Sequence, residues 1–263
     1  MHWTEDFFIK NAKLYAPALE AMEKEGIHEA RLIRNFLKSK GFHKANVIDI
    51  PCGTGRVSVP LAKHYNVTGV DISPYFLNLA RKRAMKNKVV SNTQFLLGNM
   101  WRLDCLFKKD WMFDVAINEF TSIGYGSEVQ DMIFFRSLRK LVKENGIFII
   151  NRLMNKEYRI RNFSNESYDG HGNRLPHEVR FFDKKKRRIK SKEEFYEKRG
   201  RDFKFLGEST TDLRIYSPRE LTKMLLKSGW RVTNLYDNLE SKRRISNETH
   251  HFTAVAKPIN YNT

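Results

Sequence analysis

The sequence has few cysteines and no long apolar segment. Only two of its 263 residues are cysteines, Cys52 and Cys105, which excludes a disulfide framework and favours a reducing, cytoplasmic compartment. The longest apolar run, residues 146–150, is far shorter than the roughly 18 residues that span a bilayer, so we expect no membrane segment. Residues 1–10 lack a basic start followed by an apolar stretch, so no signal peptide is visible.

Two common kinds of catalytic machinery are also missing. No serine–histidine–aspartate arrangement stands out, and the eight histidines show no spacing typical of metal ligands. We therefore expect no bound metal.

What the chain does have is a core and an excess of positive charge. Hydrophobic residues make up 41% of the chain, and 48 basic against 30 acidic side chains leave a net charge of +18. Six of the basic residues lie in the run 184–190. Such a run favours an anionic partner or forms a solvated turn between strands. We expect the turn, because no aromatic residues are interleaved with the charges.

Strands and helices alternate along the first 150 residues. Residues 7–40 have helical periodicity, with Gly26 expected to divide two helices and Gly41 to end the second. Short apolar runs separated by helical segments then predict five strands, at 46–50, 67–70, 93–97, 113–117 and 146–150. This alternation is typical of βαβ units and a parallel sheet.

The pattern changes after residue 154 and returns near residue 217. Residues 178–213 alternate as antiparallel strands do, and residues 217–220 form a capping box that opens a new helix. Two closing strands follow at 231–236 and 252–256. We expect one domain over residues 1–263. Its parts are N-terminal helices (1–44), a cofactor-binding core (45–151), an antiparallel insertion that covers the site (155–213), and a C-terminal helix with closing strands (214–263).

The strongest motif lies between the first two strands. Asp49 ends a strand, Gly53 and Gly55 form a turn into a helix, and Asp71 ends the next strand 22 residues after Asp49. Such glycines permit a tight turn and close approach of a ligand, and an acid at the position of Asp71 suits ribose hydroxyls. A dinucleotide site is less suitable, because Ser58 stands where a third glycine belongs and Asp49 would repel a pyrophosphate. A cationic ligand with an amino group fits better.

These residues resemble the class I S-adenosylmethionine-dependent methyltransferases, in particular a bacterial and archaeal branch that acts on small molecules. Residues 49–56 and 67–74 resemble the first two family motifs, and residues 97–100 stand where the family often has Gly-Asp-Met. Residues 113–125 resemble the fourth-strand segment. The resemblance implies a Rossmann-like, seven-stranded, mostly parallel sheet with helices on both faces, and S-adenosylmethionine as cofactor.

The resemblance also implies roles for individual residues. Asp49 would hold the ammonium group of the cofactor, Asp71 the ribose, and Ile72 would pack on the adenine. Asn99 replaces the usual aspartate at the adenine edge, and an amide can still donate and accept there. The residues expected to contact the cofactor are Asp49, Cys52, Gly53, Thr54, Gly55, Arg56, Asp71, Ile72, Asn99, Met100 and Asn118.

Direct displacement of the methyl group by a nitrogen or oxygen needs mainly alignment, with a general base only for a protonated amine or a hydroxyl. Glu119 and Tyr125 are the candidates for that base, although Glu119 is equally well read as a solvated loop acid. Candidate contacts to the acceptor are Arg152, Arg180, Arg214 and Tyr216. The aromatic residues Trp3, Phe7, Phe8 and Tyr15 either bury the first helix or close over the cofactor.

Three functions remain open. Methylation of a small molecule is the main hypothesis. An RNA or protein methyltransferase that uses the basic surface is the second, although no RNA-binding module is recognisable and Asn118 does not begin the Asn-Pro-Pro-Tyr signature of enzymes that methylate base amines. A cofactor-binding protein without catalysis is the third. The oligomeric state and the acceptor are not determined by the sequence.

Overall fold

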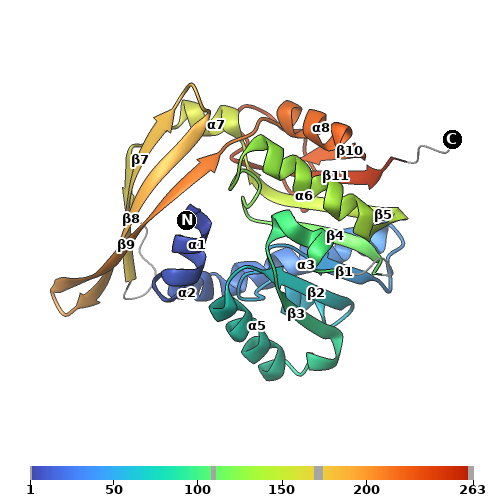
Figure 1. The fold of residues 1–263 in the computed structure, drawn as a ribbon, viewed down its shortest axis with the longest axis horizontal. Coiled ribbons are helices and arrows are strands. Elements are labelled where there is room, and N and C mark those ends of the chain that lie inside the picture. The colour runs from blue at the N-terminus through green and yellow to red at the C-terminus, as the bar shows by residue number, and fades with distance from the viewer. Residues whose placement is uncertain (1, 108–110, 169–173, 260–263) are drawn as a thin grey trace.

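Two sheets organise the chain in the computed structural model, which describes residues 2–107, 111–168 and 174–259 (Figure 1). The larger sheet has seven strands in the order β10-β11-β5-β4-β1-β2-β3. Its strands are β1 (Asn46–Asp49), β2 (Asn66–Asp71), β3 (Thr93–Leu97), β4 (Phe113–Glu119), β5 (Val142–Met154), β10 (Trp230–Tyr236) and β11 (His251–Pro258). β11 pairs antiparallel with both of its neighbours, and the other pairs are parallel. The expected fold class is thus confirmed.

Helices cover both faces of this sheet, because successive side chains of its strands point to opposite sides. Val47 belongs to one buried cluster and Ile48 to the other. The first face is covered by α3 (Glu23–Ser39), α4 (Ser58–Leu61) and α5 (Pro74–Lys86). The second is covered by η3 (Met100–Cys105), α6 (Glu128–Leu141) and α8 (Pro218–Lys227). A short helix, η2 (Val90–Asn92), precedes β3.

The N-terminal helices differ from the expectation in one respect. The chain forms α1 (Trp3–Glu5), η1 (Asp6–Lys10) and α2 (Ala12–Ala21) before α3. The break between the long helices falls at Met22, and Gly26 lies inside α3. The prediction that Gly26 divides the helices was therefore wrong. Gly26 serves close packing instead, since a Cβ there would lie 2.6 Å from the carbonyl oxygen of Arg56.

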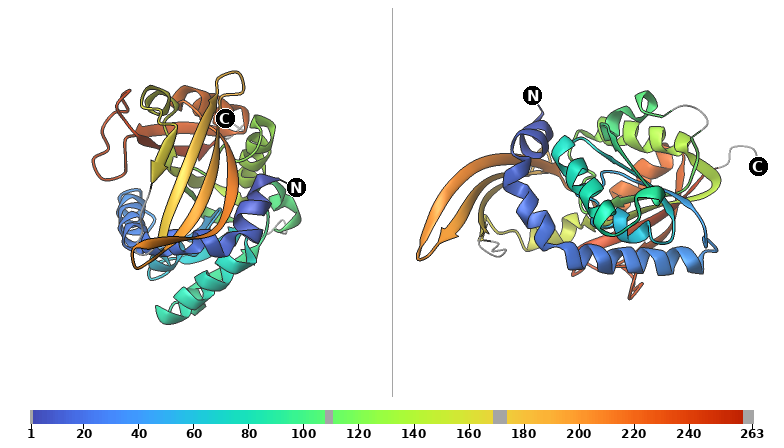
Figure 2. Two further views of the ribbon diagram at one scale, coloured as in Figure 1. Left: turned by 90° about the vertical axis from the view of Figure 1, so that its left-hand side faces the viewer. Right: turned by 90° about the horizontal axis from the view of Figure 1, so that it is seen from below.

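The insertion forms a separate antiparallel sheet in the order β6-β7-β8-β9, which extends from one side of the molecule (Figure 2). It consists of β6 (Glu166–Tyr168), β7 (Arg174–Asp183), β8 (Arg188–Arg199) and β9 (Asp202–Arg214), preceded by α7 (Lys156–Arg161), which the sequence reading missed. The expected antiparallel insertion is confirmed. Among the described residues, no helix is both long and apolar enough to cross a membrane.

The basic run forms the turn between β7 and β8 and the start of β8, but its two arginines bond to the rest of the protein. Lys184, Lys185 and Lys186 are exposed. Arg187 pairs with Glu220, and Arg188 donates a 2.8 Å hydrogen bond to the carbonyl oxygen of Gly126. The expectation of a wholly solvent-facing run is therefore corrected at Arg187 and Arg188.

The close contact at Gly26 leads to a test of stability. We expect Gly26→Ala to lower the free energy of unfolding, because crowding against Arg56 costs roughly 1–3 kcal/mol and the gain in helix propensity returns only roughly 0.5–1 kcal/mol. Urea denaturation measures the difference. Ile27→Ala is the control, since that side chain is exposed on the same helix. An increase in stability for Gly26→Ala would contradict the packing described.

Candidate active site

The site begins at the glycine turn after β1. Gly53 and Gly55 have φ values of +54° and +73°, which favour glycine. A Cβ at Gly55 would lie 3.0 Å from Ala80 on α5, whereas a Cβ at Gly53 would meet open space. The carboxylate of Asp71 holds this turn, because its oxygens accept 2.8 Å hydrogen bonds from the backbone N–H groups of Gly53 and Ser73.

A cavity opens above this turn at the carboxyl ends of the strands. Nine of the eleven residues expected to contact a cofactor line it, which are Asp49, Cys52, Gly53, Thr54, Arg56, Asp71, Ile72, Asn99 and Met100. Gly55 lies in the turn itself. Both candidate bases, Glu119 and Tyr125, also line it. Residues far apart in the sequence thus share one hollow, as a ligand site requires.

Asn118 and Asn99 hold the loops around the cavity. Asn118 donates 2.6 Å hydrogen bonds to the carbonyl oxygen of Ile50 and to the Ser122 hydroxyl, and it is not among the described residues that line the cavity. Asn118 thus joins β1 to the loop after β4, and its contact with a cofactor stays a prediction. Asn99 caps η3 by accepting a hydrogen bond from the N–H of Trp101.

Two carboxyl groups of the motif are buried. Burial raises the pKa of Asp49 to about 7, against the opposing effect of a hydrogen bond from Ser58. Burial likewise raises the pKa of Asp71 to about 6, although three backbone hydrogen bonds favour its charged form. Oδ1 of Asp49 has no hydrogen-bond partner among the described residues. A cationic ligand in the cavity would stabilise both carboxylates.

The sequence left two alternatives for Glu119, a general base or a solvated loop acid, and the structure excludes the second. It is 6% exposed at the end of β4, and Asn151 donates a 3.2 Å hydrogen bond to its Oε2. Burial, followed by the nearby charges of Glu29 and Asp49, raises the pKa of Glu119 well above its usual range.

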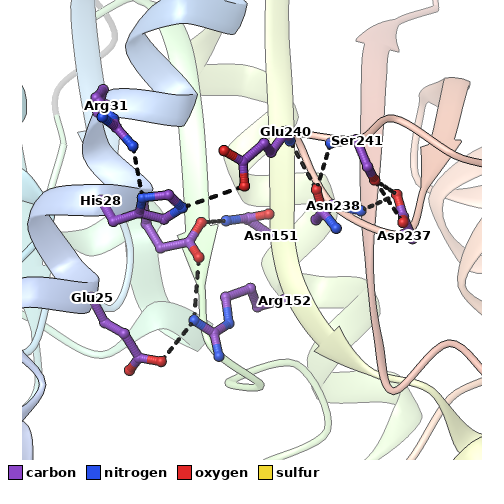
Figure 3. A network of polar contacts seen from close by, with 10 residues as sticks. Glu25, His28, Arg31, Asn151, Arg152, Asp237, Asn238, Glu240 and Ser241 are labelled. Carbon is purple, nitrogen blue, oxygen red and sulfur yellow. Dashed lines mark hydrogen bonds and ion pairs between the residues drawn. The ribbon is translucent and has the colours of Figure 1, made fainter.

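A polar network behind Glu119 fixes the position of Asn151. Asn151 also donates to Glu29 of α3, which is paired with Arg152. On the same helix His28 lies 3.8 Å from Glu240 of the loop 237–241 (Figure 3). The Thr253 hydroxyl donates a 2.6 Å hydrogen bond to the side-chain oxygen of Asn151. The amide of Asn151 thus has its orientation set from two sides, and it presents an N–H to Glu119.

The N-terminal segment forms the roof of the cavity. The indole N–H of Trp3 donates a 3.0 Å hydrogen bond to the carbonyl oxygen of Tyr125, and the rings of Phe8 and Tyr125 lie 5.4 Å apart. Phe8 and Tyr15 line the cavity, whereas Phe7 is buried and faces Phe195 of the insertion. Burial of the first helix is thus shown for Phe7, and closure of Phe8 and Tyr15 over a cofactor stays a prediction.

The four residues expected to contact the acceptor do not come together. Arg152 pairs with Glu25 and Glu29, and Arg214 donates to Glu128. Tyr216 is buried and donates a 2.7 Å hydrogen bond to Asp131. None of these three lines the cavity, and each has a partner elsewhere. Their contact with an acceptor stays a prediction.

Arg180 likewise has partners of its own and does not line the cavity. It lies on β7 beside a groove on the insertion, where it bonds Ser167 and pairs with Glu178.

Several cavity residues had escaped the sequence analysis. They are Thr4, Leu19, Met22, Phe76, Trp101 and Phe120. Phe120 has a φ of +52° and lies under the guanidinium group of Arg56, whose carbon is 3.6 Å from the ring centroid. The apolar periodicity of residues 7–40 predicted a buried helix face, but it carries no signal for the cavity that this face covers.

Comparison with known proteins agrees with this geometry. Residues 42–203 match a family model described as a methyltransferase domain. This segment is more than half of the chain, which therefore belongs to the methyltransferase-domain family. The family and the fold expected from the sequence are thereby confirmed.

Individual relatives cover different parts of the chain. It is 30% identical over 110 residues to the putative methyltransferase YqeM of Bacillus subtilis, which is 41% of this chain and 42% of that protein. The chain spans less than half the length of the curated relatives it matches.

Solved structures show the shared fold over nearly the whole chain. An S-adenosylmethionine-dependent methyltransferase from Clostridium acetobutylicum has a TM-score of 0.78 at 17% identity, with 95% of this chain and 98% of that one covered. CalS10, an amino pentose methyltransferase from Micromonospora echinaspora, has a TM-score of 0.69 at 16% identity, with 93% and 96% covered.

The buried carboxyl groups lead to a pH dependence of stability. Because folding raises the pKa of Asp49 from 3.8 to about 7, the folded chain keeps a proton that the unfolded chain releases. The free energy of unfolding without ligand should therefore fall as the pH rises from about 4 to 7. We expect Asp49→Asn to gain roughly 1–3 kcal/mol relative to the parent between pH 5 and pH 8.

Urea denaturation at both pH values measures this gain. Asp104→Asn, at an exposed position, is the control. An equal difference between Asp49→Asn and the parent at pH 5 and pH 8 would show that Asp49 is not desolvated.

Proposed function

We propose that this protein is an S-adenosylmethionine-dependent methyltransferase that acts on a nitrogen or oxygen of a small molecule, in the cytoplasm. The observation that carries the proposal is the turn at Gly53, held by the carboxylate of Asp71 at the floor of a cavity that also contains Asp49 and Glu119. A cationic nucleoside with a ribose and an amino group fits these groups. The family match and the fold support the same conclusion.

The residues present fit this cofactor. The open space at Gly53 admits a ligand against the backbone, and the buried Oδ1 of Asp49 needs a donor. When bound, S-adenosylmethionine supplies an electrophilic methyl group on a sulfonium centre. Asp71 would accept the ribose hydroxyls, and Ile72 with Met100 would pack on the base. The roof of Phe8, Tyr15 and Tyr125 would exclude water and fix the line of attack.

The acceptor would enter between the roof and the inner face of the insertion. CalS10, of similar fold, is an amino pentose methyltransferase, which supports a small polar acceptor with an amine here. Tyr125 and Glu119 lie at the cavity and are the candidates to take a proton. Burial raises the pKa of the Tyr125 hydroxyl, so it is a proton donor or a hydrogen-bond partner before it is a base.

Cofactor binding can be tested at Asp71. We expect Asp71→Asn to weaken S-adenosylmethionine by roughly 1–3 kcal/mol, because a charge-assisted bond to the ribose is lost and the turn loosens. Titration calorimetry measures the affinity, and Asp104→Asn should bind like the parent. Preference of the parent protein for a nicotinamide dinucleotide would refute the proposal.

The acceptor class can be tested at the basic turn. With methyl-labelled cofactor, we expect label in a small-molecule fraction of a cell extract, and not in RNA or protein. Changing Lys184, Lys185 and Lys186 to Gln should leave that transfer rate unchanged, because these three side chains are exposed and the turn lies at a hairpin end. Labelled RNA whose transfer depends on these lysines and falls with salt would instead establish the RNA hypothesis.

A further inference from the structure

One acid on the inner face of the insertion has no counter-ion. Glu193 lies on β8, where the alternate residues Ile189, Ser191 and Phe195 are buried, so its side chain points to the same face of the sheet. Glu193 is half-buried, and a ligand can reach it. Within the described part of the chain, no hydrogen bond or ion pair reaches its carboxylate. A partly desolvated carboxylate without a partner is costly, which indicates a ligand.

A second acid on the neighbouring strand shows what is missing. Glu178 of β7 stands directly opposite Glu193 in the register of the sheet, and like charges placed so are destabilising. Arg180 pairs with Glu178 and also bonds Ser167, so this cation is already used. Burial, followed by the charge of Glu178, raises the pKa of Glu193 to about 8, although Arg180 opposes the rise. A positive group from outside the chain would complete this pair of acids.

The inner face of the insertion at Glu193 packs against the N-terminal segment that roofs the cavity (Figures 1 and 2). Ser209 of β9, opposite Glu193 in register, donates a 3.2 Å hydrogen bond to Asp6 of η1. Phe195, two residues along the same face, has its ring centroid 6.4 Å from that of Phe7. Glu193 thus lies between two contacts to η1.

The same position places Glu193 close to the cavity. Phe8, next to Phe7 on η1, has its ring 5.4 Å from that of Tyr125, which lines the cavity. The pKa of Tyr125 is raised by burial first, and the charge of Glu193 is among those that add to the rise. The titratable and charged groups that face Glu193 are therefore Glu178 and Arg180 from β7, Asp6 from η1, and Tyr125 from the loop after β4.

We propose that Glu193 is a catalytic residue that binds the ammonium group of an amine acceptor and takes its proton. This assignment rests on the proposed function and narrows the acceptor from a nitrogen or oxygen to an amine. Glu119 lies on the opposite wall, at the end of β4, where Asn151 holds it and Asp49 is close. Glu193 lies on the insertion, the side from which the acceptor would enter.

The chemistry requires such a group because a protonated amine has no lone pair with which to attack. The carboxylate of Glu193 accepts one N–H proton of the acceptor. The freed lone pair forms the bond from nitrogen to the methyl carbon as the carbon–sulfur bond breaks, and the electron pair of that bond stays on sulfur. The product leaves as a methylated ammonium ion, and Glu193 returns its proton to water. A base whose pKa is close to the working pH suits this exchange.

Blocking the amines of an extract tests the acceptor class on the parent protein. The small-molecule fraction of a cell extract is divided, and one half is acetylated with the N-hydroxysuccinimide ester of acetic acid, which blocks primary and secondary amines. With methyl-labelled S-adenosylmethionine, the parent should label the untreated half, and labelling of the acetylated half should fall to background. Mixing the two halves should restore labelling, which excludes inhibition by the reagent.

Variants on β8 test the residue itself. We expect Glu193→Gln to slow labelling of the untreated fraction roughly 10²- to 10⁴-fold at neutral pH, the range for loss of a general base, with unchanged affinity for S-adenosylmethionine by calorimetry. Glu194→Gln is the matched control. Glu194 is the next residue, points to the opposite face and pairs with Lys192, and its variant should label like the parent.

The pH profile separates catalysis from a structural role. The parent rate should rise with pH and level off above about 8, because Glu193 acts in its deprotonated form. The rate of Glu193→Gln should continue to rise to about pH 10, as the free amine becomes more abundant in solution. A purely structural defect would lower the rate by the same factor at every pH.

The outcomes separate this inference from the proposed function. A parent protein that does not bind S-adenosylmethionine, or that labels no small molecule, would overturn the proposed function itself. Undiminished labelling of the acetylated fraction would show that the acceptor atom is not an amine and would overturn this inference alone. The parent's rate and pH profile in Glu193→Gln would do the same. If thermal melts show that Glu193→Gln does not fold, Glu193→Asp should bind S-adenosylmethionine like the parent but transfer more slowly, and transfer at the parent rate would contradict the role of Glu193.

Discussion

The hydrogen bond from the Gly53 N–H to the Asp71 carboxylate is the contact on which the site depends. It joins the turn after β1 to the end of β2, and the Ser73 N–H occupies the second oxygen at the start of α5. One carboxylate thereby sets the relative position of two βα turns. Parallel pairing of β1 with β2 brings the two turns to the same edge of the sheet. The hydrogen bonds of Asp71 then fix their relative orientation.

Several buried ionisable side chains lie around that contact. Asp49, Asp71, Glu119 and Arg56 all lie at the cavity, and a low-dielectric surrounding makes each of them costly unless a partner is present. Part of the cost is offset within the fold, by Ser58 for Asp49 and by Asn151 for Glu119. Other polar atoms of these side chains have no hydrogen-bond partner among the described residues, and a charged ligand in the cavity would supply one. These buried groups lower the stability of the protein without ligand and raise its affinity for a charged ligand.

Two segments outside the central sheet, the N-terminal helices and the insertion, pack against each other. The N-terminal helices cover the cavity, and the insertion holds them there: Phe7 faces Phe195, and the Ser209 hydroxyl donates to Asp6. Gly207 has the left-handed φ of +153° and lies against Leu14, where a Cβ would be 2.8 Å from that side chain. The N-terminal segment and the insertion thus pack against each other.

Local patterns in the sequence determined the architecture of this protein. The apolar strands, the Gly53–Gly55 turn and the acids Asp49 and Asp71 are short-range signals, and they predicted the sheet, the turn and the class of ligand. Only the tertiary structure decided which polar residues face the cavity. The sequence predicted that three polar residues contact the acceptor, but each has a partner on a distant element: Tyr216, Arg152 and Arg214. Contacts of α3, β4 and β5 instead bring Glu119, Arg56 and Phe120 together at the cavity. Such pairings depend on side-chain packing between segments far apart in the chain, which no periodicity encodes.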